Sequence, residues 1–196
     1  MREKRKKMKV ILASASPRRK ELMDMIGVSY EVVPSQFEEK RDESLERTKQ
    51  VENLSYGKAK DVFQRTTGDR IVIGCDTLVY CNGKFYGKPK VEEIARQVLR
   101  ELSGKTHEVI TGLTVLVEKD GKMEEYIDHN VTQIHIKDMT DEEINKWVET
   151  GKALDKAGAY AIQEEFCVFI DHIDGSYFST IGLPVHQLYD VLKKYI

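Results

Sequence analysis

The chain has 196 residues, 40% of them hydrophobic and 33% charged, which is enough to bury one sizeable core in a single domain. Its 31 lysines and arginines nearly balance its 33 aspartates and glutamates, so the formal net charge of −2 argues against nucleic acid or anionic lipid as a partner and favours a small molecule. No apolar run approaches the roughly 20 residues of a membrane span, and the N-terminus lacks the apolar core of a secretory signal.

The first seven residues, MREKRKK, are strongly basic. They are predicted to form a solvated tail, in preference to an arm that binds nucleic acid or a membrane, and residues 8–196 are predicted to form one domain. The three cysteines form no CxxC pair and no even set of disulfide partners. Reduced thiols, and hence a cytoplasmic protein, are therefore expected.

The first third of the chain reads as strands alternating with helices. Ser16 and Pro17 have the character of a helix start, and Gly27 that of a helix end. A longer, charged helix follows with a narrow apolar stripe, and Gly57 is a candidate interruption of it. Strands are predicted for residues 8–13 and 30–33, and helices for residues 17–26 and 44–66.

The rest of the chain continues the alternation. Asn82-Gly83 predicts a two-residue hairpin turn, and Asp120-Gly121 joins two long strands in a second hairpin. Residues 140–143 form a capping box for a helix that ends before Gly151. Strands are predicted for residues 71–80, 109–117 and 126–136, and helices for residues 91–102, 140–150 and 183–195. This order predicts an α/β fold in which helices flank a mixed twisted sheet.

The turn between the first strand and the first helix has the composition of a phosphate site. Residues 14–19, Ser-Ala-Ser-Pro-Arg-Arg, bring hydroxyls, backbone N–H groups and two guanidinium groups to a helix N-terminus, where the macrodipole favours anions. Arg18 and Arg19 oppose that dipole, so an anionic ligand would give a reason for both. The alternative is a serine cap followed by two solvated arginines.

Asp76 is the candidate for chemistry on the phosphates. It follows Gly74-Cys75 at what reads as the carboxyl end of a buried strand, where open α/β sheets hold their active groups. Its carboxylate could ligate magnesium, orient or deprotonate an attacking water, or simply satisfy the N–H groups of a turn. Lys58 and Lys88 are point charges suited to phosphate oxygens, although a lysine is more often just solvated.

Residues 158–163, Gly-Ala-Tyr-Ala-Ile-Gln, could let the backbone approach a planar base whose edge Gln163 reads, or could be a glycine turn leading into a strand. Residues 174–177 and 182–184 read as a loop and a helix start, without chemistry. The signatures GxxxxGK[ST], GxGxxG, HExxH and GxSxG do not occur, which weakens kinase, dinucleotide-enzyme, zinc-protease and α/β-hydrolase interpretations. The five histidines have no ligand-like spacing.

Taken together, five segments closely resemble motifs of the Maf family of nucleotide pyrophosphatases. They are residues 12–22, 74–77, 87–89, 154–163 and 175–184. Each motif is weak alone, but five in the same order and spacing along nearly the whole chain are specific. Only the first seven residues fall outside the resemblance.

The resemblance implies a mixed α/β fold of two lobes around a central cleft. It also implies a divalent metal, Mg²⁺ or Mn²⁺, and hydrolysis of a nucleoside triphosphate to the monophosphate and pyrophosphate, by a protein that is often a homodimer. Asp76 would be the catalytic carboxylate and proton acceptor. Phosphate contacts would come from Ser14, Arg18, Arg19, Lys58 and Lys88, and the specificity positions would be Arg18, Thr77 and Gln163.

Threonine at position 77 resembles the family branch that prefers dTTP and UTP over the branch that acts on 7-methyl-GTP. Two departures affect this expectation: Cys75 stands where many relatives have a small residue, and Glu164-Glu165 where they have glycines. The second lies beside Gln163, in the segment expected to contact the base. Two other interpretations remain at this point: a nucleotide-binding regulator of cell division without turnover, and a hydrolase for noncanonical purines such as ITP.

Overall fold

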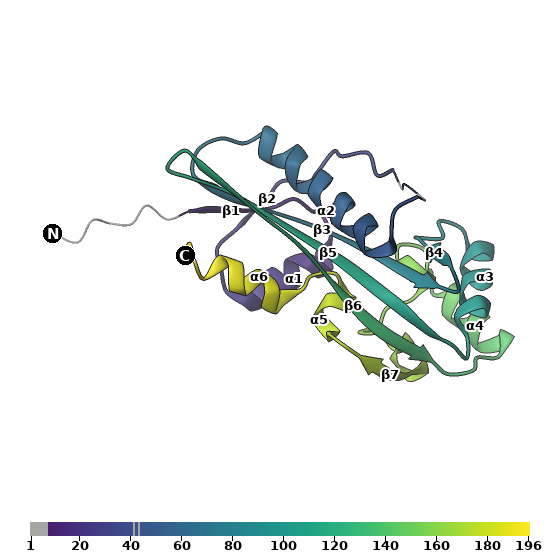
Figure 1. Cartoon of the computed structure of the whole chain (residues 1–196). Helices are drawn as coiled ribbons and strands as arrows, with labels where there is room; N and C mark the ends of the chain where they lie inside the picture. The colour runs from purple at the N-terminus through teal and green to yellow at the C-terminus, as the bar shows by residue number, and fades with distance from the viewer. Residues whose placement is uncertain (1–7, 41, 43) are drawn as a thin grey trace. The chain divides into compact units, whose positions relative to one another are not determined.

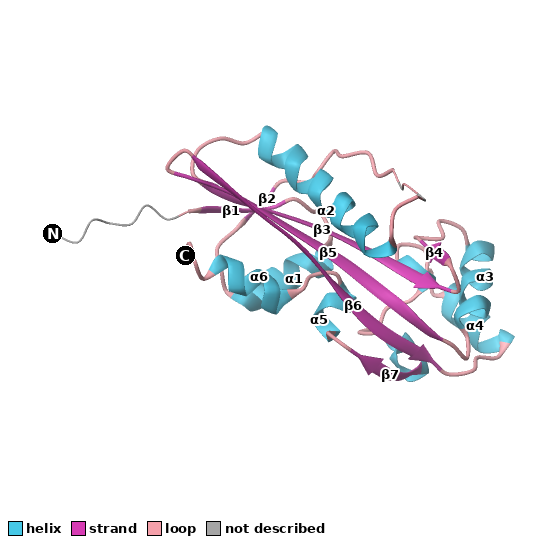
Figure 2. Cartoon of the chain, viewed as in Figure 1, coloured by secondary structure: helices cyan, strands magenta, loops and turns pink. Residues whose placement is uncertain are grey.

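The computed structural model describes residues 8–40, 42 and 44–196, so the basic segment predicted as a tail lies outside the described residues. The described chain forms a seven-stranded mixed sheet with flanking helices, as predicted (Figures 1 and 2). No helix among these residues is long and apolar enough to cross a membrane.

The elements follow the predicted order. The strands are β1 (Lys9–Leu12), β2 (Glu31–Val32), β3 (Arg70–Cys81), β4 (Lys84–Tyr86), β5 (Thr106–Lys119), β6 (Lys122–Ile136) and β7 (Ile170–Asp174). Their order in the sheet is β2-β1-β3-β5-β6-β7, with β4 paired to β3. The helices are α1 (Pro17–Ile26), α2 (Arg47–Gln64), α3 (Glu92–Leu102), α4 (Asp141–Glu149), α5 (Tyr177–Ile181) and α6 (Val185–Leu192). Two 3₁₀ turns, η1 (Ala157–Ala159) and η2 (Glu165–Phe169), lie between α4 and β7.

The chain divides into two compact units. Unit 1 contains the described residues up to Asp76, together with Gly112–His129 and Gly182–Ile196, and unit 2 contains Thr77–Thr111 and Asn130–Ile181. The long strands β3, β5 and β6 each contribute residues to both units.

Unit 1 is built on parallel strand pairs. β1 pairs with β3, with Leu12 opposite Ile73, and on its other side with β2. Helix α2 covers one face of this part of the sheet, and α1 and α6 lie beside each other on the other face (Figure 1). The core under α2 is closed by alternate strand residues and the predicted apolar stripe of the helix, since successive strand side chains point to opposite faces. It contains Ile11, Ala13, Ala59, Val62, Phe63, Val72 and Leu116.

Two strand glycines bring the backbone of α2 close to the sheet. A Cβ atom at Gly74 would lie 2.3 Å from the carbonyl oxygen of Ser55 and 2.7 Å from the backbone nitrogen of Ala59. One at Gly112 would lie 2.2 Å from the carbonyl oxygen of Val51. Because any side chain at these positions would collide with the main chain of the helix, glycine sets the distance between α2 and β3 and β5.

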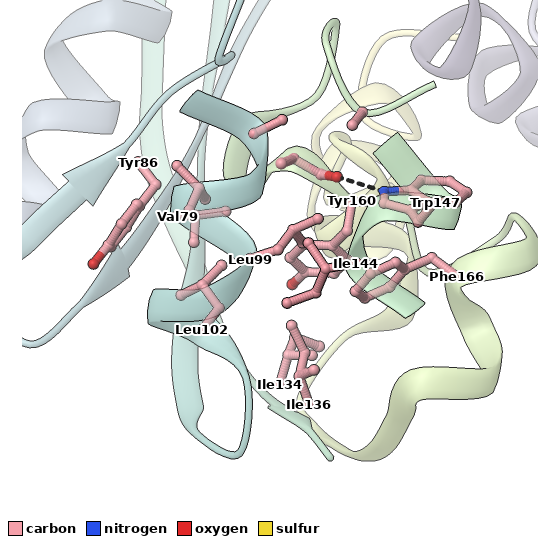
Figure 3. Close-up of a cluster of buried hydrophobic side chains, with 14 of the residues drawn as sticks. Val79, Tyr86, Leu99, Leu102, Ile134, Ile136, Ile144, Trp147, Tyr160 and Phe166 are labelled. Atoms are coloured by element: carbon pink, nitrogen blue, oxygen red, sulfur yellow. Dashed lines mark hydrogen bonds between the residues drawn. The ribbon is translucent and has the colours of Figure 1, made fainter. Parts of the chain in front are cut away.

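Unit 2 has its own aromatic core (Figure 3). The ring of Phe166 forms tilted pairs with the rings of Trp147 and Tyr160, and the indole N–H of Trp147 donates a 2.8 Å hydrogen bond to the carbonyl of Ala159. Helices α3 and α4 close this core with their apolar faces. The 3₁₀ turn η1, which contains Ala159, is therefore anchored to the core of unit 2.

Local sequence signals are placed as predicted. Asn82 and Gly83 both have positive φ in the turn between β3 and β4, as a two-residue hairpin turn requires. The capping box of α4 is present in both directions between Thr140 and Glu143. Helix α1 begins at Pro17 and ends before Gly27, which is left-handed.

Other local predictions are wrong. Gly57 does not interrupt α2, which runs through it, and the aromatic ring of Phe37 fills the space where a Cβ would lie. The loop predicted at residues 174–177 is limited to Gly175 and Ser176, because the short helix α5 begins at Tyr177. The segment beginning at Gly158 enters 3₁₀ turns and not a strand, with positive φ at Gly158 and Ala159.

Candidate functional site

Asp76 lies inside strand β3 and not at its carboxyl end, which corrects its predicted position but agrees with the strand predicted over residues 71–80. The strand continues because β4 pairs with its second half, from Val79 to Cys81. The parallel pairing does end near this point: the last β1 residue, Leu12, lies opposite Ile73. Asp76 thus follows the end of the β1–β3 ladder, on the strand face shared by Val72 and Gly74.

Lys58 connects Asp76 to a second carboxylate. Its ammonium group, carried by α2, donates to Oδ1 of Asp76 and forms an ion pair of 2.7 Å with Oε1 of Glu39. The side chains of Lys58 and Asp76 are only 12% and 7% exposed. Gly74 makes this pair possible, because the close approach of α2 to β3 brings Lys58, next to Ala59, over the strand face that carries Asp76.

The second oxygen of Asp76 is buried and has no hydrogen-bond partner within the described part of the chain. Burial raises the pKa of the Asp76 carboxyl above its usual value, against the opposing charges of Lys58 and Arg19. An unpaired buried carboxylate oxygen costs about 1–3 kcal/mol or more, so a proton, a donor or a cation at this atom would be favourable. These are the properties of a general base or a metal ligand.

Arg19 is fixed by two contacts within unit 1. Its Nε donates to the carbonyl oxygen of Gly182 at 2.9 Å, and its Nη1 donates to the hydroxyl of Ser14 at 3.2 Å. The hydroxyl of Ser14 also accepts the backbone N–H of Ser16, at 3.2 Å. Ser16 occupies the predicted N-cap position of α1, but its side chain makes no capping bond. The turn is therefore organised by Ser14, and the guanidinium of Arg19 is held near it.

The structure brings four of the predicted residues into two contacting pairs in unit 1: Ser14 with Arg19, and Lys58 with Asp76. The charge of Arg19 also acts on the Asp76 carboxyl. Arg18, the second residue of α1, is half-buried. Lys58 thus contacts the buried Asp76 carboxylate and the charge of Arg19 acts on it, and two such cations are suited to a phosphate chain.

The remaining predicted residues belong to unit 2. Thr77 is half-buried, and its hydroxyl forms a 3.0 Å hydrogen bond with the hydroxyl of Thr111. Lys88 and Gln163 are exposed. Their segments are connected, because the N–H of Gly158 donates to the carbonyl of Gly87 at 3.3 Å.

The acidic pair beside Gln163 is neutralised by lysines. Glu164 forms an ion pair of 3.2 Å with the buried Lys156, and Glu165 one of 2.5 Å with Lys152. The departure from the family pattern at these two positions is therefore accompanied by local ion pairs within unit 2.

Three partners of the predicted residues were missed by sequence reasoning. Glu39 lies in an irregular segment before α2, the carbonyl of Gly182 is 163 positions from Arg19, and Thr111 is one threonine among several on a buried strand. No local pattern marks any of them. The Gly182 segment did belong to the motifs of the resemblance, although no chemistry was assigned to it.

The described residues contain no group of three or more His, Cys, Asp or Glu side chains that could hold a metal by themselves. A magnesium-type cation does not need one, since it is commonly held by one or two carboxylates together with substrate phosphates. The Asp76 oxygen that has no hydrogen-bond partner among the described residues fits this kind of binding.

Comparison with known proteins identifies the family. A dTTP/UTP pyrophosphatase of Alkaliphilus metalliredigens is 46% identical over 187 residues, covering 95% of this chain and 96% of that protein. One of Bacillus pumilus is 42% identical over 186 residues, with 95% and 96% covered. Among solved structures, a HAM1 protein from Coxiella burnetii aligns with 95% of this chain and 99% of its own, at 14% identity and a TM-score of 0.49. Residues 9–195 match the Maf-like protein family, and the chain belongs to that family.

Proposed function

We propose that this chain is a nucleoside triphosphate pyrophosphatase that hydrolyses dTTP and UTP to the monophosphate and pyrophosphate. The observation that carries the proposal is the similarity, over 95% of the chain, to relatives named dTTP/UTP pyrophosphatase. The geometry of unit 1 supports it, since a buried carboxylate of raised pKa lies beside Lys58 and Arg19.

In the proposed reaction Asp76 accepts a proton from the water that attacks the α-phosphorus. The new P–O bond forms on that phosphorus, the bond to the bridging oxygen breaks, and pyrophosphate leaves. Ser14, Arg18, Arg19, Lys58 and Lys88 contact the phosphates in this proposal, and Arg18, Thr77 and Gln163 contact the base. Positioned cations stabilise the negative charge that develops on the phosphate oxygens.

We also propose that a divalent cation, Mg²⁺ or Mn²⁺, is held by Asp76 together with oxygens of the nucleotide. When bound, such a cation neutralises phosphate charge and polarises the P–O bonds. The carboxylate oxygen of Asp76 that no described residue hydrogen-bonds supports this assignment.

The test measures pyrophosphate release from dTTP and UTP by the purified full chain with Mg²⁺ or Mn²⁺. Asp76→Asn is expected to lower kcat by about 10²-fold or more while keeping the circular dichroism spectrum of the parent, since a well-placed base or metal ligand is lost. The matched control is Asp171→Asn, which changes an exposed aspartate and is expected to leave kcat unaltered. Full activity in Asp76→Asn would refute the catalytic assignment.

The other interpretations are outcomes of the same assay. A panel of dTTP, UTP, ITP and 7-methyl-GTP ranks the substrates by kcat/KM. Preference for ITP or 7-methyl-GTP would overturn the pyrimidine assignment, and nucleotide binding without release of pyrophosphate would identify a regulator of cell division.

The remaining parts of the proposal concern organisation. We propose that residues 8–196 act as one catalytic domain in the cytoplasm, as a homodimer. Three free cysteines support a reducing compartment, and the family resemblance supports the dimer. Sedimentation equilibrium measures the oligomeric state directly, and a monomer at assay concentration would refute the dimer.

A further inference from the structure

A chain of three hydrogen-bonding groups in unit 2 ends at Thr77. The hydroxyl of Thr77 lies 3.0 Å from the hydroxyl of Thr111, and the hydroxyl of Thr111 lies 2.8 Å from the backbone carbonyl oxygen of Ser179. Thr111 and Ser179 are fully buried, whereas Thr77 is half-buried and accessible to a ligand.

The direction of these bonds follows from the groups themselves. A carbonyl oxygen can only accept, so Thr111 must donate its one hydroxyl hydrogen to Ser179. The oxygen of Thr111 is then available to Thr77 only as an acceptor. Thr77 must therefore donate its own hydrogen to Thr111, and its two lone pairs are left to face a ligand.

We propose that Thr111 is a positioning residue for nucleotide selection: it holds the hydroxyl of Thr77 as a hydrogen-bond acceptor, which selects a base with a ring N–H. This inference rests on the proposed function and deepens it. Thymine and uracil carry a hydrogen on N3, which can donate to such an acceptor. Cytosine has a lone pair on N3, so it would face the lone pairs of Thr77 and leave both groups unpaired.

Because Thr111 and Ser179 are buried, the direction of the hydrogen bond between them is fixed. Leaving the carbonyl of Ser179 without its donor would cost the desolvation penalty of a buried acceptor, so Thr111 cannot easily turn its hydrogen towards Thr77. An isolated threonine hydroxyl, by contrast, rotates to donate or accept as its partner demands. Discrimination between a base with a hydrogen on N3 and one with a lone pair there thus comes from Thr111 and Ser179, which lie behind Thr77.

The experiment compares kcat and KM for dTTP and dCTP in the full chain, in Thr111→Val and in Thr111→Ser. Valine has nearly the shape of threonine but no hydroxyl, so Thr77 becomes free to donate. The ratio of kcat/KM for dTTP to that for dCTP is expected to fall about tenfold, the effect of one neutral hydrogen bond, mainly through KM. Serine keeps the hydroxyl and is expected to restore the ratio.

A ratio unchanged in folded Thr111→Val, or lowered equally by Thr111→Ser, would overturn the inference. If the valine variant does not fold, the parent enzyme provides a second test with 3-methyl-UTP, which lacks the N3 hydrogen. Its KM is expected to exceed that of UTP at least tenfold, and equal KM values would also overturn the inference. Failure of the parent to release pyrophosphate from either dTTP or UTP is a distinct result, because it refutes the proposed function itself.

Discussion

Replacing Gly74 by alanine tests whether the close approach of α2 to β3 positions the candidate catalytic pair. The added Cβ would lie 2.3 Å from the carbonyl oxygen of Ser55, whereas ordinary contact begins at 3.4 Å. The difference, 3.4 − 2.3, means that the helix must retreat by about 1 Å. Because Lys58 is carried by the same helix, its ammonium group would move away from Asp76.

Two effects of Gly74→Ala are expected. Overpacking against the main chain of α2 is expected to lower the free energy of unfolding by about 1–3 kcal/mol, measured by urea denaturation. A misplacement of about 1 Å near the reacting groups is expected to lower kcat for dTTP by about 10²-fold, measured at a temperature where the variant remains folded.

Gly57→Ala is the matched control, because it makes the same change on helix α2 but its nearest neighbours are atoms of the Phe37 ring, a side chain that can turn away. Its unfolding free energy is expected to stay within about 1 kcal/mol of the parent, since alanine is the better helix former. An unfolding midpoint and a kcat for Gly74→Ala within twofold of the parent values would show that Gly74 does not set the geometry of the Lys58–Asp76 pair.

Two further predictions concern pH. Asp76 must be ionised to act as a base, so kcat is expected to fall as the pH drops through its raised pKa. Lys58→Gln removes a positive charge that lowers this pKa, so the fall in kcat should move to higher pH, whereas the control Lys60→Gln, at an exposed position, should leave it in place. A shift to lower pH in Lys58→Gln would contradict the assignment. Burial lowers the pKa of His107 from 6.5 to about 4, so the unfolded chain binds a proton that the folded chain does not between these values. The free energy of unfolding, measured by urea denaturation, should thus fall by about 3 kcal/mol between pH 6.5 and pH 4. The fall should be smaller in His107→Phe and unchanged in the control His172→Gln. A fall in His107→Phe as large as in the parent would refute the assignment.

Features that depend on neighbours in the sequence could be predicted from it. The hairpin turn at Asn82-Gly83, the capping box at Thr140 and the helix end at Gly27 are each specified by a few adjacent residues. The family resemblance is likewise confirmed, because its motifs are short segments in a fixed order.

Features that depend on distant partners could not be predicted. The strand predicted over residues 71–80 is present, but the end of its parallel pairing just before Asp76 depends on where β1 stops, opposite Ile73. Gly57 looked like a break in α2, but the ring of Phe37 packs where its side chain would be. The partners of Lys58 and Arg19, Glu39 and the carbonyl of Gly182, are chosen by tertiary contacts that no local pattern records.

The glycine on α2 and the two glycines on the strands beneath it differ in which second substitution could rescue an added side chain. At Gly57 the obstacle is a side chain, so a smaller residue in place of Phe37 would make room for a Cβ and act as a suppressor. At Gly74 and Gly112 the nearest obstacles are main-chain atoms of α2, which every amino acid possesses. No exchange of a neighbouring residue removes them, so a side chain at either strand position can be accommodated only if the whole helix moves.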